Sequence, residues 1–272
     1  MFPPCGTECH GSKSACAALD TTKDSRVSRL AARSAKDCLM SNLVLVHGAW
    51  HGAWCWARVL PGLRRRGHRV FAVTLTGVGE RAHLLRPDIT LQTHIDDVAM
   101  LIEAEELRDV VLVGHSYAGI MITGVADRMP QRLKHLVYVD AVIAHPGESW
   151  SSTHPAAVQA QRRAAIAVHG FIPAASASTY GLTGDDAQWV ERRQTPHPGK
   201  VYDEPLHFDA ARMLALPRTF LACTDPALPT IAVARTRART EPGWRVVELA
   251  TGHDPMISAP DEFEAAVLAA AT

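Results

Sequence analysis

The chain has 272 residues, 47% of them hydrophobic, which is long enough for one large domain with a substantial core. Its 28 basic and 28 acidic residues balance, so no net field favours nucleic acid or an anionic membrane surface, and we expect neither as a partner. No apolar run reaches the roughly 18 to 20 residues that span a bilayer and the N-terminus has no secretory apolar region, which predicts a cytoplasmic location.

Residues 1–39 are rich in small and polar side chains and show neither strand nor helix periodicity, which predicts a disordered N-terminal extension. The first convincing strand comes directly after Met40, so Met40 is a candidate for the native start. Four of the six cysteines lie before it, and Cys5, Cys9 and His10 match no structural zinc spacing well. We therefore expect no disulfide framework, no metal and no other cofactor.

From residue 42 onward, short β-branched runs alternate with helical patterns, which indicates a mostly parallel, doubly wound α/β sheet. The runs are apolar throughout, as expected for strands that are buried on both faces. The predicted strands are 42–46, 69–73, 110–113, 135–139, 218–222 and 244–249. The predicted helices are 54–66, 92–107, 117–128, 227–239 and 260–270.

Residues 141–205 interrupt this alternation with many Ala, His, Pro and Gln residues and no clear strand. Helical stretches are expected at 155–168 and 184–193. We interpret the segment as a helical cap inserted into a catalytic domain that spans residues 40–272. Such an insert follows a strand end, where the open edge of a parallel sheet gathers its binding site.

The sharpest motif is Gly-His-Ser-Tyr-Ala-Gly at 114–119, between a predicted strand and a predicted helix. A Gly-x-Ser-x-small-Gly motif in this context is typical of a nucleophile elbow, whose tight turn needs small flanking residues. The helix N-terminus also favours negative charge that develops beside Ser116. A glycine-bounded turn with an ordinary capping serine is the alternative.

A serine nucleophile needs a histidine base and an acid that orients it, in the chain order serine, acid, histidine. His253 follows the last predicted strand, and Asp225 follows the strand before it. Asp225 also suits a helix N-cap. Asp140, at the end of an earlier strand, is the main rival, whereas Asp254, Asp185 and Asp186 are weaker candidates for the acid.

An oxyanion hole requires preorganised N–H donors. The loop His-Gly-Ala-Trp at 47–50 follows the first strand, and Tyr117 follows the nucleophile, so we expect the Ala49 and Tyr117 N–H groups to be the donors. His47 is interpreted as a residue that holds this loop rather than as a second base.

Together these motifs resemble a branch of the α/β-hydrolase superfamily that contains plant methyl-ester esterases, hydroxynitrile lyases and bacterial carboxylesterases, some of which hydrolyse pyrethroids. The resemblance covers about residues 42–270 and includes the doubled His-Gly-Ala-Trp block at 47–54 and Gly-His-Arg-Val at 67–70. It implies an α/β-hydrolase fold, the triad Ser116, Asp225 and His253, and Ala49 and Tyr117 as oxyanion donors. The lyases of this branch carry threonine and lysine where this chain has Gly48 and Asp254, so the resemblance favours hydrolysis.

We therefore predict a serine carboxylesterase that cleaves small, apolar or aromatic esters through an acyl-enzyme. Trp50, Trp54 and Phe171 are the predicted substrate-binding residues, although such aromatic side chains also suit a plain core. A lyase or other non-hydrolytic enzyme on the same triad, or a ligand-binding receptor of the same fold, is the alternative. The sequence leaves a homodimer open.

Overall fold

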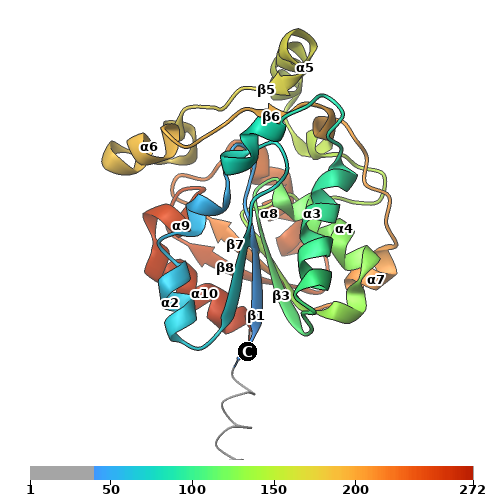
Figure 1. Ribbon diagram of the computed structural model, residues 1–272, viewed down its shortest axis with the longest axis vertical. Coiled ribbons are helices and arrows are strands. Elements are labelled where there is room, and N and C mark those ends of the chain that lie inside the picture. The colour runs from blue at the N-terminus through green and yellow to red at the C-terminus, as the bar shows by residue number, and fades with distance from the viewer. Residues whose placement is uncertain (1–39, 272) are drawn as a thin grey trace, which may run out of the picture. The chain divides into compact units, whose positions relative to one another are not determined.

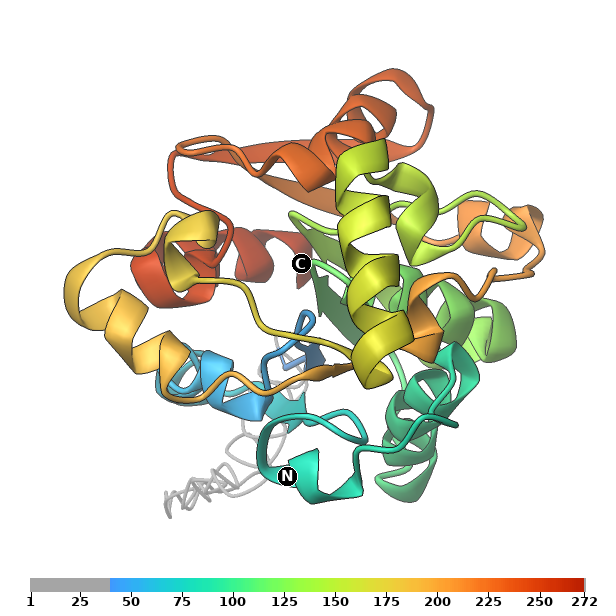
Figure 2. The same cartoon turned by 90° about the horizontal axis from the view of Figure 1, so that it is seen from above.

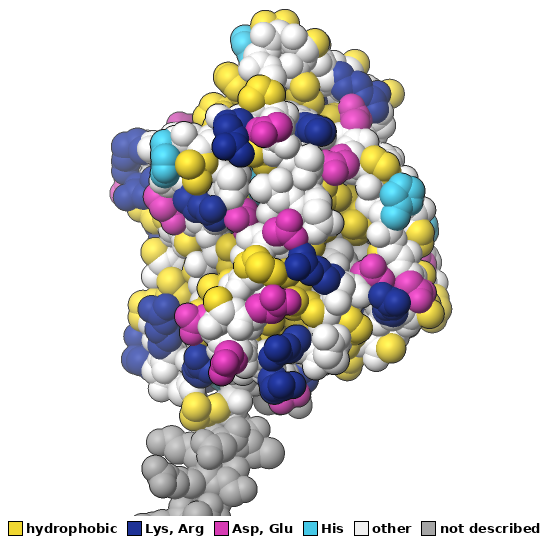
Figure 3. All heavy atoms as spheres, turned by 45° about the vertical axis from the view of Figure 1, so that its right-hand side comes forward, with side chains coloured by type: hydrophobic (Ala, Val, Ile, Leu, Met, Phe, Trp, Pro, Cys, Tyr) yellow, Lys and Arg dark blue, Asp and Glu magenta, His cyan; other side chains and the backbone are white. Residues whose placement is uncertain are grey.

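The computed structural model describes residues 40–271. The expectations for the N-terminal extension, its four cysteines and His10 lie outside this range. No helix of the described part is long and apolar enough to cross a membrane. Basic and acidic side chains are interspersed on the surface shown in Figure 3, as the balanced composition predicts.

Six strands form one sheet in the order β2-β1-β3-β4-β7-β8, and every neighbouring pair is parallel. Strands β3 and β7 are buried along their whole length because helices cover both faces of the sheet. All six predicted strands are confirmed, and the structure extends three of them by one or two residues. The strands are β1 (Asn42–Val46), β2 (Arg69–Val73), β3 (Val110–His115), β4 (Leu133–Val139), β7 (Arg218–Cys223) and β8 (Trp244–Leu249).

Helices flank the sheet on both sides, with α2, α9 and α10 on one side and α3 and α4 on the other (Figure 1). Thr90 caps α3 by accepting a hydrogen bond from the Thr93 N–H, and the helix buries an apolar stripe that includes Ile95 and Val98. The predicted helices are confirmed, although α2 begins six residues and α8 five residues later than predicted; the other ends shift by at most three residues. The predicted helices correspond to α2 (Leu60–Arg65), α3 (Leu91–Ala104), α4 (Ala118–Arg128), α8 (Ala232–Thr240) and α10 (Pro260–Ala271).

Two short helices were not predicted. One is α9 (Pro255–Ser258), directly after the His253 loop, and the other is α7 (Ala210–Leu214), before β7. Helices of four or five residues have too few turns to show a clear apolar period.

The chain between β4 and β7 rises over the carboxyl ends of the strands (Figures 1 and 2). The helices predicted there correspond to α5 (Ala156–His169) and α6 (Gly184–Glu191). Two strands of two residues each, β5 (Phe171–Ile172) after α5 and β6 (His197–Pro198) after α6, pair antiparallel and were not predicted. We call residues 141–205 the cap.

Candidate active site

Ser116 lies in the turn between β3 and α4, and its φ of +54° places it in the left-handed region. This backbone conformation is costly for a residue with a side chain and persists only where the surroundings enforce it. The flanking positions must be glycine because a Cβ there would overlap neighbouring atoms. A Cβ on Gly119 would lie 2.1 Å from the carbonyl oxygen of Val142, and one on Gly114 would lie 2.9 Å from Ile122. The segment therefore has the strand-turn-helix geometry that the motif predicts.

His253 follows β8 and is almost fully buried. Its Nδ1 lies 2.7 Å from Oδ2 of Asp140, and its backbone N–H donates to the Tyr180 carbonyl of the cap at 2.9 Å. His253 and Ser116 line the same small cavity of about 60 Å³, which we call the inner cavity. A carboxylate that accepts from Nδ1–H leaves the Nε2 lone pair free to act as a base.

Asp140 is fully buried at the carboxyl end of β4 and adopts a φ of +39°. Its backbone N–H donates to the Leu221 carbonyl of β7 at 2.8 Å. Its second carboxylate oxygen, Oδ1, accepts from Nη1 of Arg235 on α8 at 2.9 Å. Both oxygens of the carboxylate are thus bound, which fixes its direction toward the histidine.

The structure corrects the expected pairing of Asp225 with His253. Asp225 follows β7 as predicted, but it is exposed; its backbone N–H donates to the Thr251 carbonyl, and no hydrogen bond to its carboxylate is found within the described chain. Strands β4 and β7 are parallel neighbours, so both acids reach the same edge of the sheet. The backbone turn at Asp140 is what directs one of them to the histidine. Asp186 instead pairs with Arg58, at 2.6 Å.

The Ala49 and Tyr117 N–H groups donate no hydrogen bond within the described chain. Ala49 follows β1, and the next residue, Trp50, has a φ of +66°. Tyr117 is the N-cap of α4, where the first N–H groups of a helix lack partners. These are the two donors that the sequence predicts for an oxyanion hole.

His47 holds this loop, as the sequence analysis expects. Its Nε2 accepts from the Leu75 N–H at 3.1 Å, so its Nδ1 carries the hydrogen and donates to the Gly48 carbonyl at 2.7 Å. Burial lowers the pKa of His47 to about 3, so the ring is neutral. A Cβ on Gly48 would lie 2.8 Å from Cβ of Ser116, so only glycine brings the loop this close to the nucleophile.

Asp254 belongs to a second buried cluster that sequence reasoning did not identify. Its carboxylate lies 3.3 Å from Nε2 of His51 and 3.3 Å from Nε2 of His115. Burial raises the pKa of the Asp254 carboxyl, but the charge of His51 opposes this, and the net effect lowers that pKa to about 2. Nδ1 of His51 lies 2.8 Å from the Ala49 carbonyl, so a hydrogen bond connects the cluster to the oxyanion loop. The second His-Gly-Ala-Trp repeat carries His51 and is the only sequence signal for it.

Atoms of His115, His253 and Asp254 that could bind a metal lie within 4.8 Å of one another. His253 Nδ1 already binds Asp140, and His115 Nε2 lies 2.9 Å from the His253 carbonyl. A metal at this place would have to compete with these hydrogen bonds. The expectation that the protein binds no metal stays a prediction.

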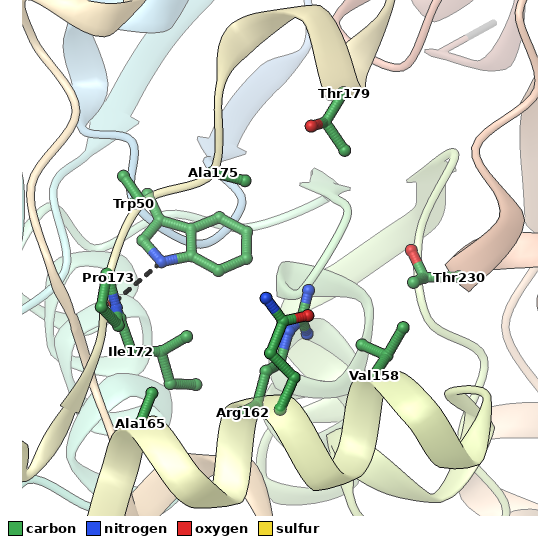
Figure 4. Close-up of a pocket in the computed structure, with 11 residues that line it drawn as sticks. Trp50, Val158, Arg162, Ala165, Ile172, Pro173, Ala175, Thr179 and Thr230 are labelled. Carbon is green, nitrogen blue, oxygen red and sulfur yellow. Dashed lines mark hydrogen bonds between the residues drawn. The ribbon is translucent and has the colours of Figure 1, made fainter. Parts of the chain in front are cut away.

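A second cavity of about 360 Å³, the outer cavity, is lined mainly by apolar residues of the cap (Figure 4). Trp50 and Arg162 line both cavities, and the Trp50 indole N–H donates to the Ile172 carbonyl at 3.0 Å. Trp50 is therefore placed where the sequence analysis expects a substrate-binding residue.

Trp54 and Phe171, in contrast, line neither cavity. Trp54 stacks on His51 and packs edge-on against Trp189 of α6, with ring centroids 5.1 Å apart in both pairs. Phe171 stacks on His169, while its neighbour Ile172 lines the outer cavity. Successive side chains of a strand point to opposite sides, so only one of the two can face the cavity. Because neither side chain lines these two cavities, a role of Trp54 and Phe171 in binding substrate stays a prediction.

A model of the alpha/beta hydrolase family matches residues 43–266. The chain belongs to this family. Among its alpha/beta hydrolase relatives, the carbendazim hydrolyzing esterase of Nocardioides sp. (strain SG-4G) is 42% identical over 82% of this chain and 97% of its own length. The pyrethroid hydrolase of Sphingobium wenxiniae is 27% identical over 84% of this chain and 86% of its own length. An extracellular alpha/beta-hydrolase from a Paenibacillus species has the same fold, with a TM-score of 0.76, 23% identity, and coverage of 85% of this chain and 98% of its own.

Proposed function

We propose that this protein is a serine carboxylesterase that hydrolyses small esters through Ser116, His253 and Asp140. Family membership and the esterase relatives make it an ester hydrolase. The observation that carries the assignment of residues is the bond between His253 Nδ1 and the buried Asp140 carboxylate, on the wall of the cavity that holds Ser116.

In the proposed reaction, Nε2 of His253 takes the hydroxyl proton of Ser116 while Oγ attacks the ester carbonyl carbon. The Ala49 and Tyr117 N–H groups bind the resulting oxyanion, and Asp140 stabilises the imidazolium. The tetrahedral intermediate collapses, and His253 gives its proton to the leaving alcohol. A water molecule, activated by the same histidine, then attacks the acyl-enzyme and releases the acid and free Ser116.

The cavities support an ester with one small and one larger apolar part. The inner cavity beside Ser116 has room for a group of a few atoms, whereas the outer cavity can hold an aromatic ring against Trp50. The named substrates of the relatives, carbendazim and pyrethroids, make their esters the first compounds to test on this chain.

Ser116→Ala is expected to abolish ester hydrolysis while leaving the fold intact, because it removes only the nucleophilic oxygen. Turnover of a panel of aryl and alkyl esters measures the loss, and circular dichroism checks the fold. A fluorophosphonate should label the natural enzyme at Ser116, as identified by peptide mass spectrometry. Labelling of another serine, or substantial activity in a pure Ser116→Ala preparation, would overturn the assignment.

A cytoplasmic location stays a prediction, and a homodimer stays open. Cell fractionation tests the location, and sedimentation velocity tests the oligomeric state.

A further inference from the structure

Arg162 brings a positive charge into the substrate cavities. It projects from the cap helix α5 beside Trp50 and lines both the inner and the outer cavity (Figure 4). Its guanidinium carbon lies 4.8 to 5.5 Å from the ring centroids of Trp150, Trp50 and Tyr202. Aromatic faces attract a cation, which explains how the charge is held at this depth.

The guanidinium carbon lies over the faces of these rings, and the N–H donors of a guanidinium lie in its own plane. One donor interacts with the Tyr202 hydroxyl. Nη1 of Arg162 donates to Nδ1 of His154 at 3.3 Å. Burial lowers the pKa of His154 to about 3, so this partner is neutral. Within residues 40–271, Arg162 forms no ion pair with an aspartate or glutamate. Its neighbour Arg163 does form one, with Asp203 at 2.9 Å.

The lining of the two cavities contains no acidic residue at all. Arg162 is therefore a partly buried positive charge beside a mainly apolar lining, without a negative partner among the described residues. A buried charge is usually paired, and a planar guanidinium is suited to bind both oxygens of a carboxylate. A ligand that supplies a carboxylate would complete the site.

We propose that Arg162 determines substrate specificity by binding a carboxylate on the larger part of the ester, so that the preferred substrates are half-esters of aromatic or similar dicarboxylic acids. This inference rests on the proposed esterase function. The small alcohol of such an ester occupies the inner cavity at Ser116. The rest of the acid extends past Trp50 into the outer cavity. Its free carboxylate binds Arg162, which lines both cavities.

The test compares an anionic and a neutral ester of similar shape, monomethyl terephthalate and methyl 4-nitrobenzoate, in the natural enzyme and in variants. Arg162→Met removes the charge and keeps much of the length of the side chain. It should lower the ratio of kcat/KM for the anionic over the neutral ester at least tenfold, mainly through KM. Arg162→Lys should retain part of the preference, because it keeps the charge but loses the planar pair of donors.

Arg163→Met is the matched control, since it removes the same charge from the next residue of the same helix and should leave the ratio unchanged. If Arg162 only held α5 in place, Arg162→Met would reduce turnover of both esters equally. That result, or an unchanged ratio, would overturn the proposal.

Binding separates this proposal from the proposed function. In a Ser116→Ala background, calorimetry should find that monomethyl terephthalate binds at least tenfold more weakly once Arg162 is also changed to Met, and that added salt weakens the binding only while Arg162 is present. This result would support the carboxylate site even if neither ester were hydrolysed by the natural enzyme. Equal affinity with and without Arg162 would overturn the site and leave the esterase assignment untouched.

Discussion

Asp140 is held by two donors from different parts of the chain, His253 from the loop after β8 and Arg235 from α8. A buried carboxylate needs such partners, because an unpaired charge would be costly away from water. With one oxygen fixed by the guanidinium, the other can point in only one direction. Arg235 thus positions the acid, and the acid in turn positions the imidazole for Ser116.

Asp140→Asn should reduce kcat by about four orders of magnitude, as loss of the acid does in a related triad, because the amide cannot stabilise the imidazolium and permits the wrong tautomer. Asp225→Asn should change kcat little, since that carboxylate lies exposed and apart from His253. Steady-state hydrolysis of one aryl ester measures both variants. The reverse pattern, with Asp225→Asn inactive and Asp140→Asn active, would show that Asp225 is the acid after all.

Among individual residues, the sequence predicts Ser116 and His253 because few residues share their positions. Ser116 lies in a glycine-bounded turn, and His253 lies in the loop after the last strand. It does not choose between Asp140 and Asp225. Both follow buried parallel strands in the correct order, and the choice depends on the backbone torsion at Asp140, which no local pattern encodes. The family resemblance implies Asp225, but a position in the chain does not specify the direction of its side chain.

The elbow between β3 and α4 depends on two elements approaching more closely than side chains normally allow. Gly119, in the first turn of α4, packs against the backbone of Val142, where the chain leaves β4. Gly124, in the same helix, faces the ends of the flexible Ile95 and Leu206 side chains. The two glycines therefore have different tolerances to an added methyl group.

Gly119→Ala should destabilise the protein by about 1 to 3 kcal/mol and reduce esterase activity, because the new Cβ overlaps a backbone carbonyl that cannot move alone. Gly124→Ala is the control. Ile95 can shift, and alanine favours a helix by about 1 kcal/mol over glycine, so little net loss of stability is expected. Urea unfolding midpoints measure both variants. An equal loss from the two substitutions would contradict the steric argument.

Strands and long helices could be predicted to within two or three residues because their apolar periods are long and uninterrupted. The cap could not be predicted in the same detail. Its strands β5 and β6 have two residues each, too few for any period, and its rings are positioned by contacts with distant segments such as Trp50. This is why Arg162, a residue of an otherwise ordinary helix, gave no signal in the sequence.

For the molecule as a whole, the core contains an unusual number of buried neutral histidines. Burial lowers the pKa of each of them, which means that the folded protein resists protonation at these sites. They are His47, His94, His115, His154 and His197. The unfolded chain takes up a proton at each histidine below about pH 6.5, whereas the folded chain does not. Acid therefore favours unfolding.

Whether stability rises or falls with pH depends on the number of protons bound by the folded and the unfolded protein. Between the unfolded pKa of about 6.5 and the folded pKa of about 3, His47 and His154 each bind a proton only when unfolded, so stability is complete above pH 6.5 and falls as the pH falls. The loss is about 1 kcal/mol per pH unit for each histidine. His51 acts in the opposite sense, because Asp254 outweighs the effect of burial and raises its pKa. The five histidines with a lowered pKa outnumber His51, so we expect a net loss of stability as the pH falls.

The free energy of unfolding in urea is therefore expected to fall by a few kcal/mol between pH 7.5 and 5, with about 1 kcal/mol per pH unit below pH 6.5 from each of His47 and His154. His154→Gln should make this slope shallower by about one proton, since the amide can still accept a hydrogen bond from Arg162 but does not titrate. His207→Gln, on an exposed side chain, is the matched substitution for comparison. A free energy of unfolding that stayed constant from pH 7.5 to 5 would mean that these rings are protonated in the folded protein. The neutral environment assigned to Arg162 would then be wrong as well, because a charged His154 would repel it.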